Sequence, residues 1–198
     1  FAFYTSCRTQ PLSGLTHTTS EIAEIHSMSM EHWTYPWMKY FFGDATEKYL
    51  YAHLSSALMT VPYLVSVDEF QHRVFENPTM SAAERRAVWH EIETIYLPWR
   101  NYDGNKFLEE GGFWMQKQHV FLYPFYYVDY ALAQMGAFEF YGRMKNDREN
   151  AWKDYYKLCQ TGGSKGYFDT LKLANLSCPL KEGAVAKAVA GVLDELKV

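Results

Sequence analysis

The sequence predicts an all-α fold, expected as a single helical unit over residues 1–198. Helix-start motifs of the form Ser/Thr/Asp-x-x-Glu recur along the chain, and the apolar–polar alternation typical of strands is almost absent. Apolar residues make up 48% of the 198 residues and charged residues 21%, as in folded globular proteins. No internal repeat, linker or change of composition marks a second domain. We therefore expect roughly seven or eight helices around one core.

The first helices are predicted from capping motifs and prolines. The segment Thr18–Glu21 is a capping box, and Pro36 should bend or end the helix that it opens, because proline clashes with the preceding turn. The segment Asp44–Glu47 predicts a second helix, which Pro62 should interrupt. The segment Ser66–Glu69 then predicts a third helix that ends at the next Asn-Pro pair.

The second half of the chain continues this pattern. The capping box Ser81–Glu84 predicts a helix that Pro98 halts, and the Asn-, Asp- and Gly-rich stretch 99–112 predicts a loop with at most a short helix. Pro124 suits the first position of a helix that runs to about Lys145. Three further helices are expected at about 147–161, 165–175 and 182–197.

Charge and cysteine content exclude several classes of protein. Lys and Arg total 19 against 23 Asp and Glu, a net charge of -4 without a basic block, so neither nucleic acid nor a membrane surface is an expected partner. No run of about 18 uncharged apolar residues is apparent, so no membrane span is expected. Cys7, Cys159 and Cys178 are an odd number at long spacings, which is typical of reduced thiols and indicates a cytoplasmic protein.

Two carboxylates form the first candidate site. Glu24 and Glu31 are seven positions apart, so on a helix they project in directions about 20° apart, with Met28 between them. Among apolar neighbours such a pair is costly unless a cation or histidines share it, which is the situation of a metal ligand and a supporting carboxylate. A solvated helix face is the alternative interpretation.

A histidine followed by tyrosines forms the second candidate site. On the helix expected after Pro124, the phenols lie within an arc of about 100°, close behind His119. Such phenols and a histidine can donate hydrogen bonds to a developing oxyanion. An aromatic core stripe is the alternative. The tyrosines concerned are Tyr123, Tyr126, Tyr127 and Tyr130.

Other motifs predict no site. The segment Glu69–His72 has the Glu-x-x-His spacing of di-iron proteins, which need two such pairs. His90 begins a sequence like H-E-x-x-H, but Thr94 replaces the second histidine, so a salt-bridged surface helix is expected. The segment Gly162–Lys165 is expected to end a helix rather than to bind phosphate. Three histidines show no partner pattern and are expected to be ordinary surface or core residues: His17, His32 and His53.

The segment from Glu24 to Glu31, followed by Trp33, resembles the segment that carries the third zinc ligand in the oligoendopeptidase F branch of the thimet oligopeptidase family. The similarity extends over nearly all 198 residues, in the family's order, and covers the C-terminal portion of such an enzyme. The other similar stretches are 68–78, 96–99, 124–134 and 162–165.

This resemblance implies the C-terminal part of a thimet oligopeptidase- or neurolysin-like catalytic domain. In this family an H-E-x-x-H helix supplies two zinc-binding histidines and the general base, and its place would be directly before Phe1. We therefore expect the chain alone to be inactive and to bind zinc weakly or not at all.

The resemblance also implies roles for individual residues. Glu24 is similar to the third zinc ligand, and Glu31 to the carboxylate that orients a zinc-binding histidine. The catalytic residues implied are His119 and Tyr130, which stabilise the oxyanion, with Tyr123 and Tyr126 as companions.

The implied function is that of a zinc metalloendopeptidase, with Zn²⁺ as cofactor. Its partners would be an oligopeptide substrate and the N-terminal remainder of the same polypeptide. The alternative is a non-catalytic helical scaffold or interaction domain, because one carboxylate without its histidines is a poor zinc site.

Overall fold

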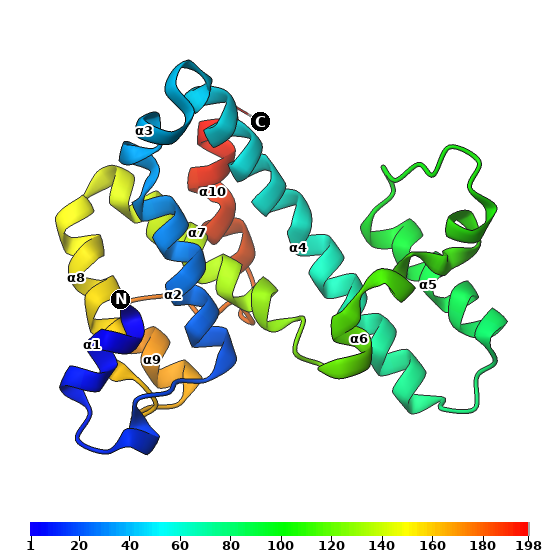
Figure 1. The fold of residues 1–198 in the computed structure, drawn as a ribbon, viewed down its shortest axis with the longest axis horizontal. Helices are drawn as coiled ribbons and strands as arrows, with labels where there is room; N and C mark the ends of the chain where they lie inside the picture. Colours follow the sequence, from blue (N-terminus) through cyan, green and yellow to red (C-terminus); the bar gives the residue numbers. More distant parts are fainter. Residues whose placement is uncertain (198) are drawn as a thin grey trace. The chain divides into compact units, whose positions relative to one another are not determined.

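The computed structural model describes residues 1–197, and this part of the chain contains helices and turns without a strand (Figure 1), which confirms the all-α prediction. Short 3-10 and π turns connect the α-helices. The α-helices are α1 (Ala2–Thr9), α2 (Ser20–Trp33), α3 (Lys39–Phe42), α4 (Thr46–Glu76), α5 (Ala82–Tyr96), α6 (Gln118–Leu122), α7 (Asp129–Asn146), α8 (Arg148–Thr161), α9 (Tyr167–Leu173) and α10 (Ala184–Leu196).

The chain forms two compact units. Unit 1 comprises Phe1–Leu58 and the chain from Leu132 onward, and unit 2 comprises Met59–Ala131. Both boundaries fall inside helices, α4 and α7, so neither a linker nor a change of composition marks them in the sequence. This is why the sequence predicted one unit without a boundary.

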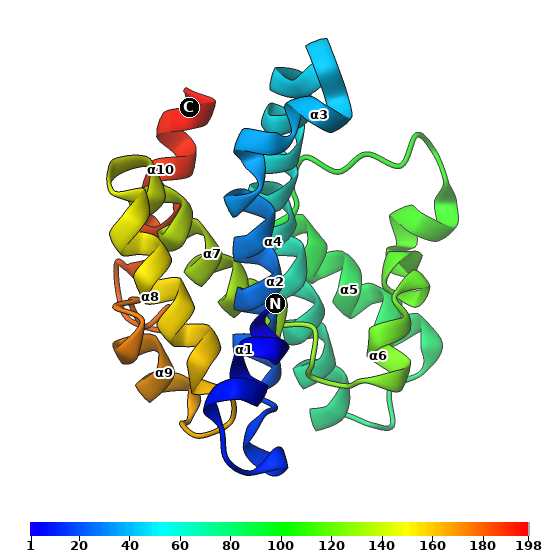
Figure 2. The same cartoon turned by 60° about the vertical axis from the view of Figure 1, so that its left-hand side comes forward.

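Unit 1 is built around α2. Its buried side chains Ile22 and Ile25 have less than a tenth of their surface exposed, as has Trp33 at its end, which packs edge-to-face on Trp152 of α8. Helix α1 lies along α8 (Figure 2), where the Ser6 hydroxyl donates to a backbone carbonyl oxygen at 2.7 Å. The apolar face of α2 is therefore fixed against its neighbours, and its opposite face is left for polar side chains.

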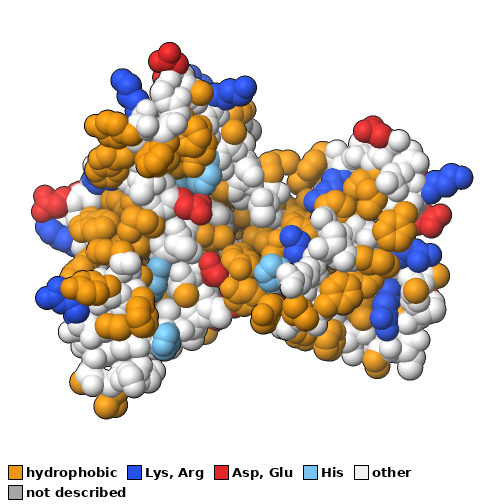
Figure 3. Space-filling view, in the orientation of Figure 1, with side chains coloured by type: hydrophobic (Ala, Val, Ile, Leu, Met, Phe, Trp, Pro, Cys, Tyr) orange, Lys and Arg blue, Asp and Glu red, His pale blue; other side chains and the backbone are white. Residues whose placement is uncertain are grey.

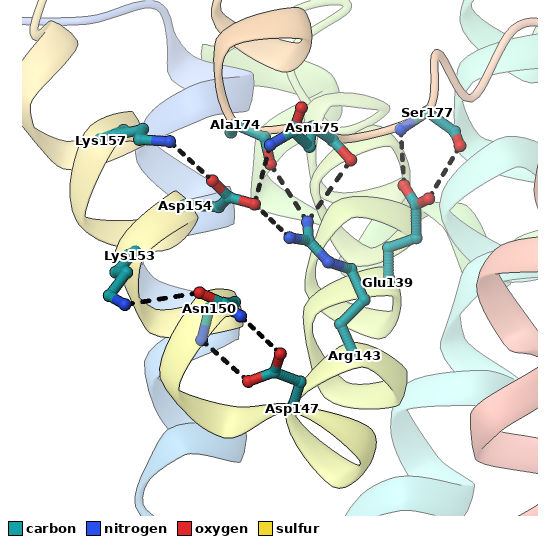
Figure 4. A network of polar contacts seen from close by, with 10 residues as sticks. All are labelled: Glu139, Arg143, Asp147, Asn150, Lys153, Asp154, Lys157, Ala174, Asn175 and Ser177. Carbon is teal, nitrogen blue, oxygen red and sulfur yellow. Dashed lines mark hydrogen bonds and ion pairs between the residues drawn. The ribbon is translucent and has the colours of Figure 1, made fainter.

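A buried polar network joins α7, α8 and the segment after α9 (Figure 4). The Arg143 guanidinium forms an ion pair with Asp154, and the Asn175 amide donates to the same carboxylate at 2.9 Å. Glu139 accepts hydrogen bonds from the backbone and hydroxyl of Ser177, at 2.7 and 2.8 Å. Both carboxylates are buried, so this network satisfies groups that would otherwise destabilise the unit.

Unit 2 has its own aromatic core between α4, α5 and the following loop. Phe70 packs edge-to-face on Trp89, with ring centroids 5.5 Å apart. The Glu93 carboxylate, 5% exposed, accepts hydrogen bonds from Tyr102 at 2.5 Å and Arg100 at 2.9 Å. The core residues of this cluster are Tyr63, Leu64, Val67, Phe70, Trp89, Ile92, Leu97, Trp114, Tyr127 and Ala131.

Three helix predictions hold, whereas the predicted start of the first long helix does not. The capping box at Ser81 is present with both hydrogen bonds, α5 ends before Pro98, and α8 begins after Asp147. Helix α2, in contrast, begins at Ser20 behind Thr19, whose side chain makes no cap hydrogen bond, so the capping box predicted at Thr18–Glu21 is absent.

Pro62 does not interrupt α4, contrary to the prediction. The Ser66 hydroxyl donates to the Tyr63 carbonyl at 2.8 Å inside the helix, so Ser66 does not open a new one. Burial of the apolar face around Leu64 and Val67 offsets the backbone hydrogen bond that the proline removes.

One helical stretch is long and apolar enough to span a membrane, although no such stretch was expected from the sequence. The helical stretch Lys39–Glu76 includes an 18-residue window of mean hydropathy 1.3, of which 28% is buried within the structure. Core helices of soluble proteins pass the same test, and α4 contributes Leu64, Val67 and Phe70 to the core of unit 2. The composition of this stretch therefore does not assign a span.

Candidate functional site

Helix α2 positions the two carboxylates as predicted. Glu24 is half-buried and Glu31 exposed on the side of the helix away from Ile22 and Ile25. The hydroxyl of Ser27 donates to Glu24 Oε2 at 3.0 Å. Because the apolar face of α2 is buried, the direction of both carboxylates is set by packing elsewhere on the helix.

A histidine side chain lies within hydrogen-bond distance of Glu31. The sequence predicted that a cation or a histidine would accompany this carboxylate. His53 Nε2, from α4, lies 3.0 Å from Glu31 Oε2, and its Nδ1 lies 2.6 Å from the hydroxyl of Tyr35. Tyr35 belongs to the 3-10 turn Tyr35–Trp37 that follows α2. Neither partner could be predicted from the sequence, because 22 positions separate Glu31 from His53 and no local pattern joins them.

His32, the neighbour of Glu31, is buried and 1% exposed. Burial, together with the nearby His53, lowers the pKa of His32 to about 4, so its imidazole is neutral at physiological pH. Neither of its ring nitrogens has a hydrogen-bond partner among the described residues. His32 thus matches the prediction of a core histidine, whereas His53 does not.

The predicted tyrosine helix starts later than expected. Helix α7 begins at Asp129, and Phe125 adopts a left-handed conformation with φ of 63°, which a helix cannot contain. The Phe125 backbone N–H donates instead to Gln71 Oε1 at 3.0 Å. The prediction of a helix from Pro124 is therefore wrong, and of the four tyrosines only Tyr130 lies on a helix.

The turn nevertheless gathers the tyrosines around His119, which lies on α6. The Tyr130 ring stands edge-on to the imidazole with centroids 6.1 Å apart, and the Tyr126 ring stacks on it at 6.0 Å. Tyr123 is more distant, at 6.4 Å, and exposed. The nearest ring is that of buried Tyr127, at 4.9 Å, which belongs to the predicted arc of phenols but has no catalytic role implied by the resemblance.

The imidazole of His119 is held in its neutral form. Desolvation by burial, followed by the charge of Lys117, lowers the pKa of His119 below its ordinary value of 6.5. Lys117 Nζ lies 4.9 Å from the centre of the Tyr127 ring. His119 Nδ1 is buried without a hydrogen-bond partner among the described residues. A neutral imidazole beside phenols can donate hydrogen bonds to an anionic group.

The described residues do not by themselves form a zinc site. No group of three or more His, Cys, Asp and Glu that could hold a metal ion occurs within residues 1–197. Catalytic zinc needs three protein ligands and an open position. The carboxylate of Glu24 has the chemistry of one such ligand. Glu24 and Glu31 belong to unit 1, whereas His119 and Tyr130 belong to unit 2.

The motifs that predicted no site behave as expected. Arg73 pairs with Glu69 at 2.7 Å and with Glu91 at 2.9 Å, which makes this a salt-bridged surface. Gly163 donates to the Leu15 carbonyl at 2.8 Å, and a Cβ at this position would lie 2.1 Å from another carbonyl oxygen. The glycine pair after α8 therefore ends the helix and allows a close backbone approach.

A family model described as Peptidase family M3 matches residues 2–189. The chain belongs to peptidase family M3. This confirms the resemblance to the oligoendopeptidase F group. A search of curated protein sequences gives no match.

Solved structures agree with membership of the M3 family. An X-ray structure described as an oligoendopeptidase F is 49% identical with a TM-score of 0.95, covering 99% of this chain and 34% of that one. PZ peptidase A with an inhibitor is 46% identical with a TM-score of 0.94, covering 99% and 35%. An oligoendopeptidase F from Bacillus anthracis str. Ames is 42% identical with a TM-score of 0.82, covering 99% and 32%. The chain thus spans about a third of the length of these relatives.

Proposed function

We propose that this chain is part of a zinc metalloendopeptidase that cleaves oligopeptides, and that it supplies the third zinc ligand and the groups that stabilise the oxyanion. The observation that carries the proposal is the M3 family match over residues 2–189. The position of Glu24 on the polar face of α2 supports it, because a carboxylate there can reach a ligand outside its own helix.

Glu24 is the proposed zinc ligand. Its carboxylate is half-buried, and the Ser27 hydrogen bond at 3.0 Å limits its rotation, so less freedom is lost when it binds a cation. Zinc in such a site polarises the scissile carbonyl and lowers the pKa of bound water. The remaining ligands must come from outside the described residues.

His119 and Tyr130 are the proposed oxyanion donors. A neutral imidazole N–H and a phenol O–H can both donate to an oxygen that gains negative charge, and donors that are already oriented lose little free energy in doing so. Tyr126 packs on both rings, with centroids 6.0 Å from His119 and 5.2 Å from Tyr130, and is proposed to hold them in place.

An exposed apolar surface on unit 1 has the character of an interaction site. Hydrophobic side chains lie exposed over α3 (Figure 3), where Tyr40 is 85% and Phe41 75% exposed. Patches of this kind mark interaction sites. We propose that the remainder of a longer polypeptide covers them. Hydrogen exchange in the full-length protein should then show protection of residues 37–51, and unprotected exchange there would contradict the idea.

The three free cysteines support a cytoplasmic location.

The test is hydrolysis of a quenched fluorescent oligopeptide by the full-length protein. We expect cleavage that a zinc chelator abolishes and added Zn²⁺ restores. A chelator that leaves cleavage unchanged, or a lack of any cleavage, would count against the proposal. The second candidate, a non-catalytic scaffold, is favoured by the lack of a three-residue metal group within residues 1–197 and predicts neither cleavage nor bound zinc.

A further inference from the structure

We propose that Tyr35 and His53 are positioning residues, which together orient the carboxylate of Glu31 through a chain of two hydrogen bonds. This inference rests on the proposed function, in which Glu31 supports a zinc-binding histidine. It assigns a task to a histidine and a tyrosine that no local sequence pattern connects to the site.

The chemistry of the three groups indicates the direction of the hydrogen bonds. Glu31 is a carboxylate and can only accept, so His53 Nε2, at 3.0 Å, must carry a proton. In the neutral imidazole Nδ1 is then an acceptor, and the Tyr35 hydroxyl at 2.6 Å donates to it. The chain therefore runs from Tyr35 through His53 to Glu31, with every donor and acceptor along it matched.

The surroundings hold this chain in place. Burial, with a further contribution from neighbouring Tyr141, raises the pKa of Tyr35 well above its usual range, so the phenol keeps the proton that it donates. The His53 ring stacks on Tyr49 at 5.6 Å and meets Tyr35 edge-on at 5.6 Å. The Glu31 side chain is 57% exposed, and a carboxylate this exposed would rotate freely without a fixed donor.

Only Oε2 of Glu31 takes part in this hydrogen bond. A carboxylate has room for further donors on its other oxygen, so Glu31 can accept from His53 and from a second imidazole at once. A carboxylate that accepts a hydrogen bond from a metal-binding histidine fixes the orientation of that histidine and increases metal affinity.

The test uses the full-length enzyme with histidine labelled with ¹⁵N in the ring. We expect the NMR signals of His53 to show the Nε2–H form. In Tyr35→Phe this preference should weaken, whereas Tyr49→Phe, which removes a hydroxyl from a stacked ring that makes no hydrogen bond to His53, should leave it unchanged. Observation of the Nδ1–H form in the unaltered enzyme would overturn the proposed direction of the chain.

Zinc affinity provides the second readout. His53→Leu should weaken zinc binding by about tenfold and lower kcat more than it changes KM, because partners outside the metal ligands typically contribute 10- to 100-fold. His53→Gln should restore much of the affinity, because an amide offers one donor and one acceptor. The melting temperature of each variant separates this effect from a loss of folding.

The outcomes separate the two proposals. If His53→Leu and His53→Gln both bind zinc and turn over substrate like the unaltered enzyme, the positioning role is wrong while the peptidase stands. If the unaltered protein binds no zinc and cleaves no peptide, the proposed function fails and the positioning role fails with it.

Discussion

The two candidate sites are built in different ways. In unit 1, one helix carries both Glu24 and Glu31, and burial of its apolar face orients them. In unit 2, His119 lies on α6 and Tyr130 on α7, and the tyrosines between them are placed by a turn with a left-handed residue. A helix fixes the direction of its side chains through a repeating geometry, whereas a turn fixes them through particular backbone conformations and contacts. The two units should therefore respond differently to substitution.

The largest effect is expected in unit 2, at Tyr130. Tyr130→Phe in the full-length enzyme should lower kcat by about 10²- to 10³-fold, or about 3 kcal/mol, because it removes an oxyanion donor and leaves the ring packing intact. Zinc content should not change. Tyr123→Phe and Tyr126→Phe are the matched controls and should have smaller effects. If either control lowers kcat more than Tyr130→Phe does, Tyr130 is not the main oxyanion donor.

In unit 1 the largest effect on stability is expected at Asp154. Asp154→Ala should lower the free energy of unfolding by about 3 kcal/mol, because it leaves the Arg143 guanidinium without its buried partner. Asp169→Ala removes an exposed pair with Lys172 and should cost less than about 1 kcal/mol. Urea denaturation measures both. Equal losses would show that the network in Figure 4 is not what stabilises this unit.

The effect of Asp154 should depend on pH. Burial by itself would raise the pKa of Asp154, but hydrogen bonds from Asn175, Arg143 and Lys157 outweigh it and hold the pKa below the ordinary 3.8. A carboxyl with a lowered pKa in the folded state stabilises the protein above its unfolded pKa, and this stabilisation is lost as the pH falls through the folded pKa. The difference between Asp154→Ala and the unaltered protein should therefore shrink below about pH 4. A constant difference would contradict this.

A glycine tests whether unit 2 depends on its turns. Gly111 has φ of 87°, and a Cβ there would lie 2.0 Å from the Arg86 carbonyl oxygen. Gly111→Ala should lower the free energy of unfolding by at least about 2 kcal/mol, since a left-handed L-residue alone costs about 1–2 kcal/mol. Gly104 has a similar φ of 80°, but a Cβ there would meet no atom within 4 Å. Gly104→Ala should therefore lower the free energy of unfolding only by the cost of the left-handed backbone conformation. Similar losses would mean that the close approach is relieved by movement.

The smallest effects concern the helix caps of the two units. Ser81→Ala removes the hydroxyl that accepts from the Glu84 backbone N–H in the capping box of unit 2 and should cost about 1 kcal/mol. Thr19→Ala, at the start of α2 in unit 1, removes no cap hydrogen bond and should change the stability by less than about 0.5 kcal/mol. Thermal unfolding measures the difference, which should vanish if cap geometry does not matter here.

The same contrast explains what could be predicted from the sequence. The all-α class, the capping box at Ser81 and the shared face of Glu24 and Glu31 follow from helical periodicity and local motifs, and these predictions are confirmed. The helix expected from Pro124 is wrong, because Phe125 adopts a left-handed conformation and its backbone N–H donates to the side chain of Gln71, 54 positions away.

Tertiary contacts also override local signals. Pro62 would end an isolated helix, yet α4 continues because Leu64 and Val67 on the following turns are buried. The partner of Glu31 is separated from it by 22 positions, and the lowered pKa of His119 depends on burial that composition does not reveal. Residue types and spacing predict candidate side chains, but not the distant neighbours that bind them or shift their pKa values.

The most direct test of the account is the zinc content of Glu24→Gln in the full-length protein, measured after equilibration with buffered zinc. Glu21→Gln, on the first turn of the same helix, is the matched control. The account predicts about one zinc ion for each unaltered chain and for Glu21→Gln, and a large loss of zinc and of peptide cleavage in Glu24→Gln. Full zinc content and full activity in Glu24→Gln would contradict its role as the metal ligand.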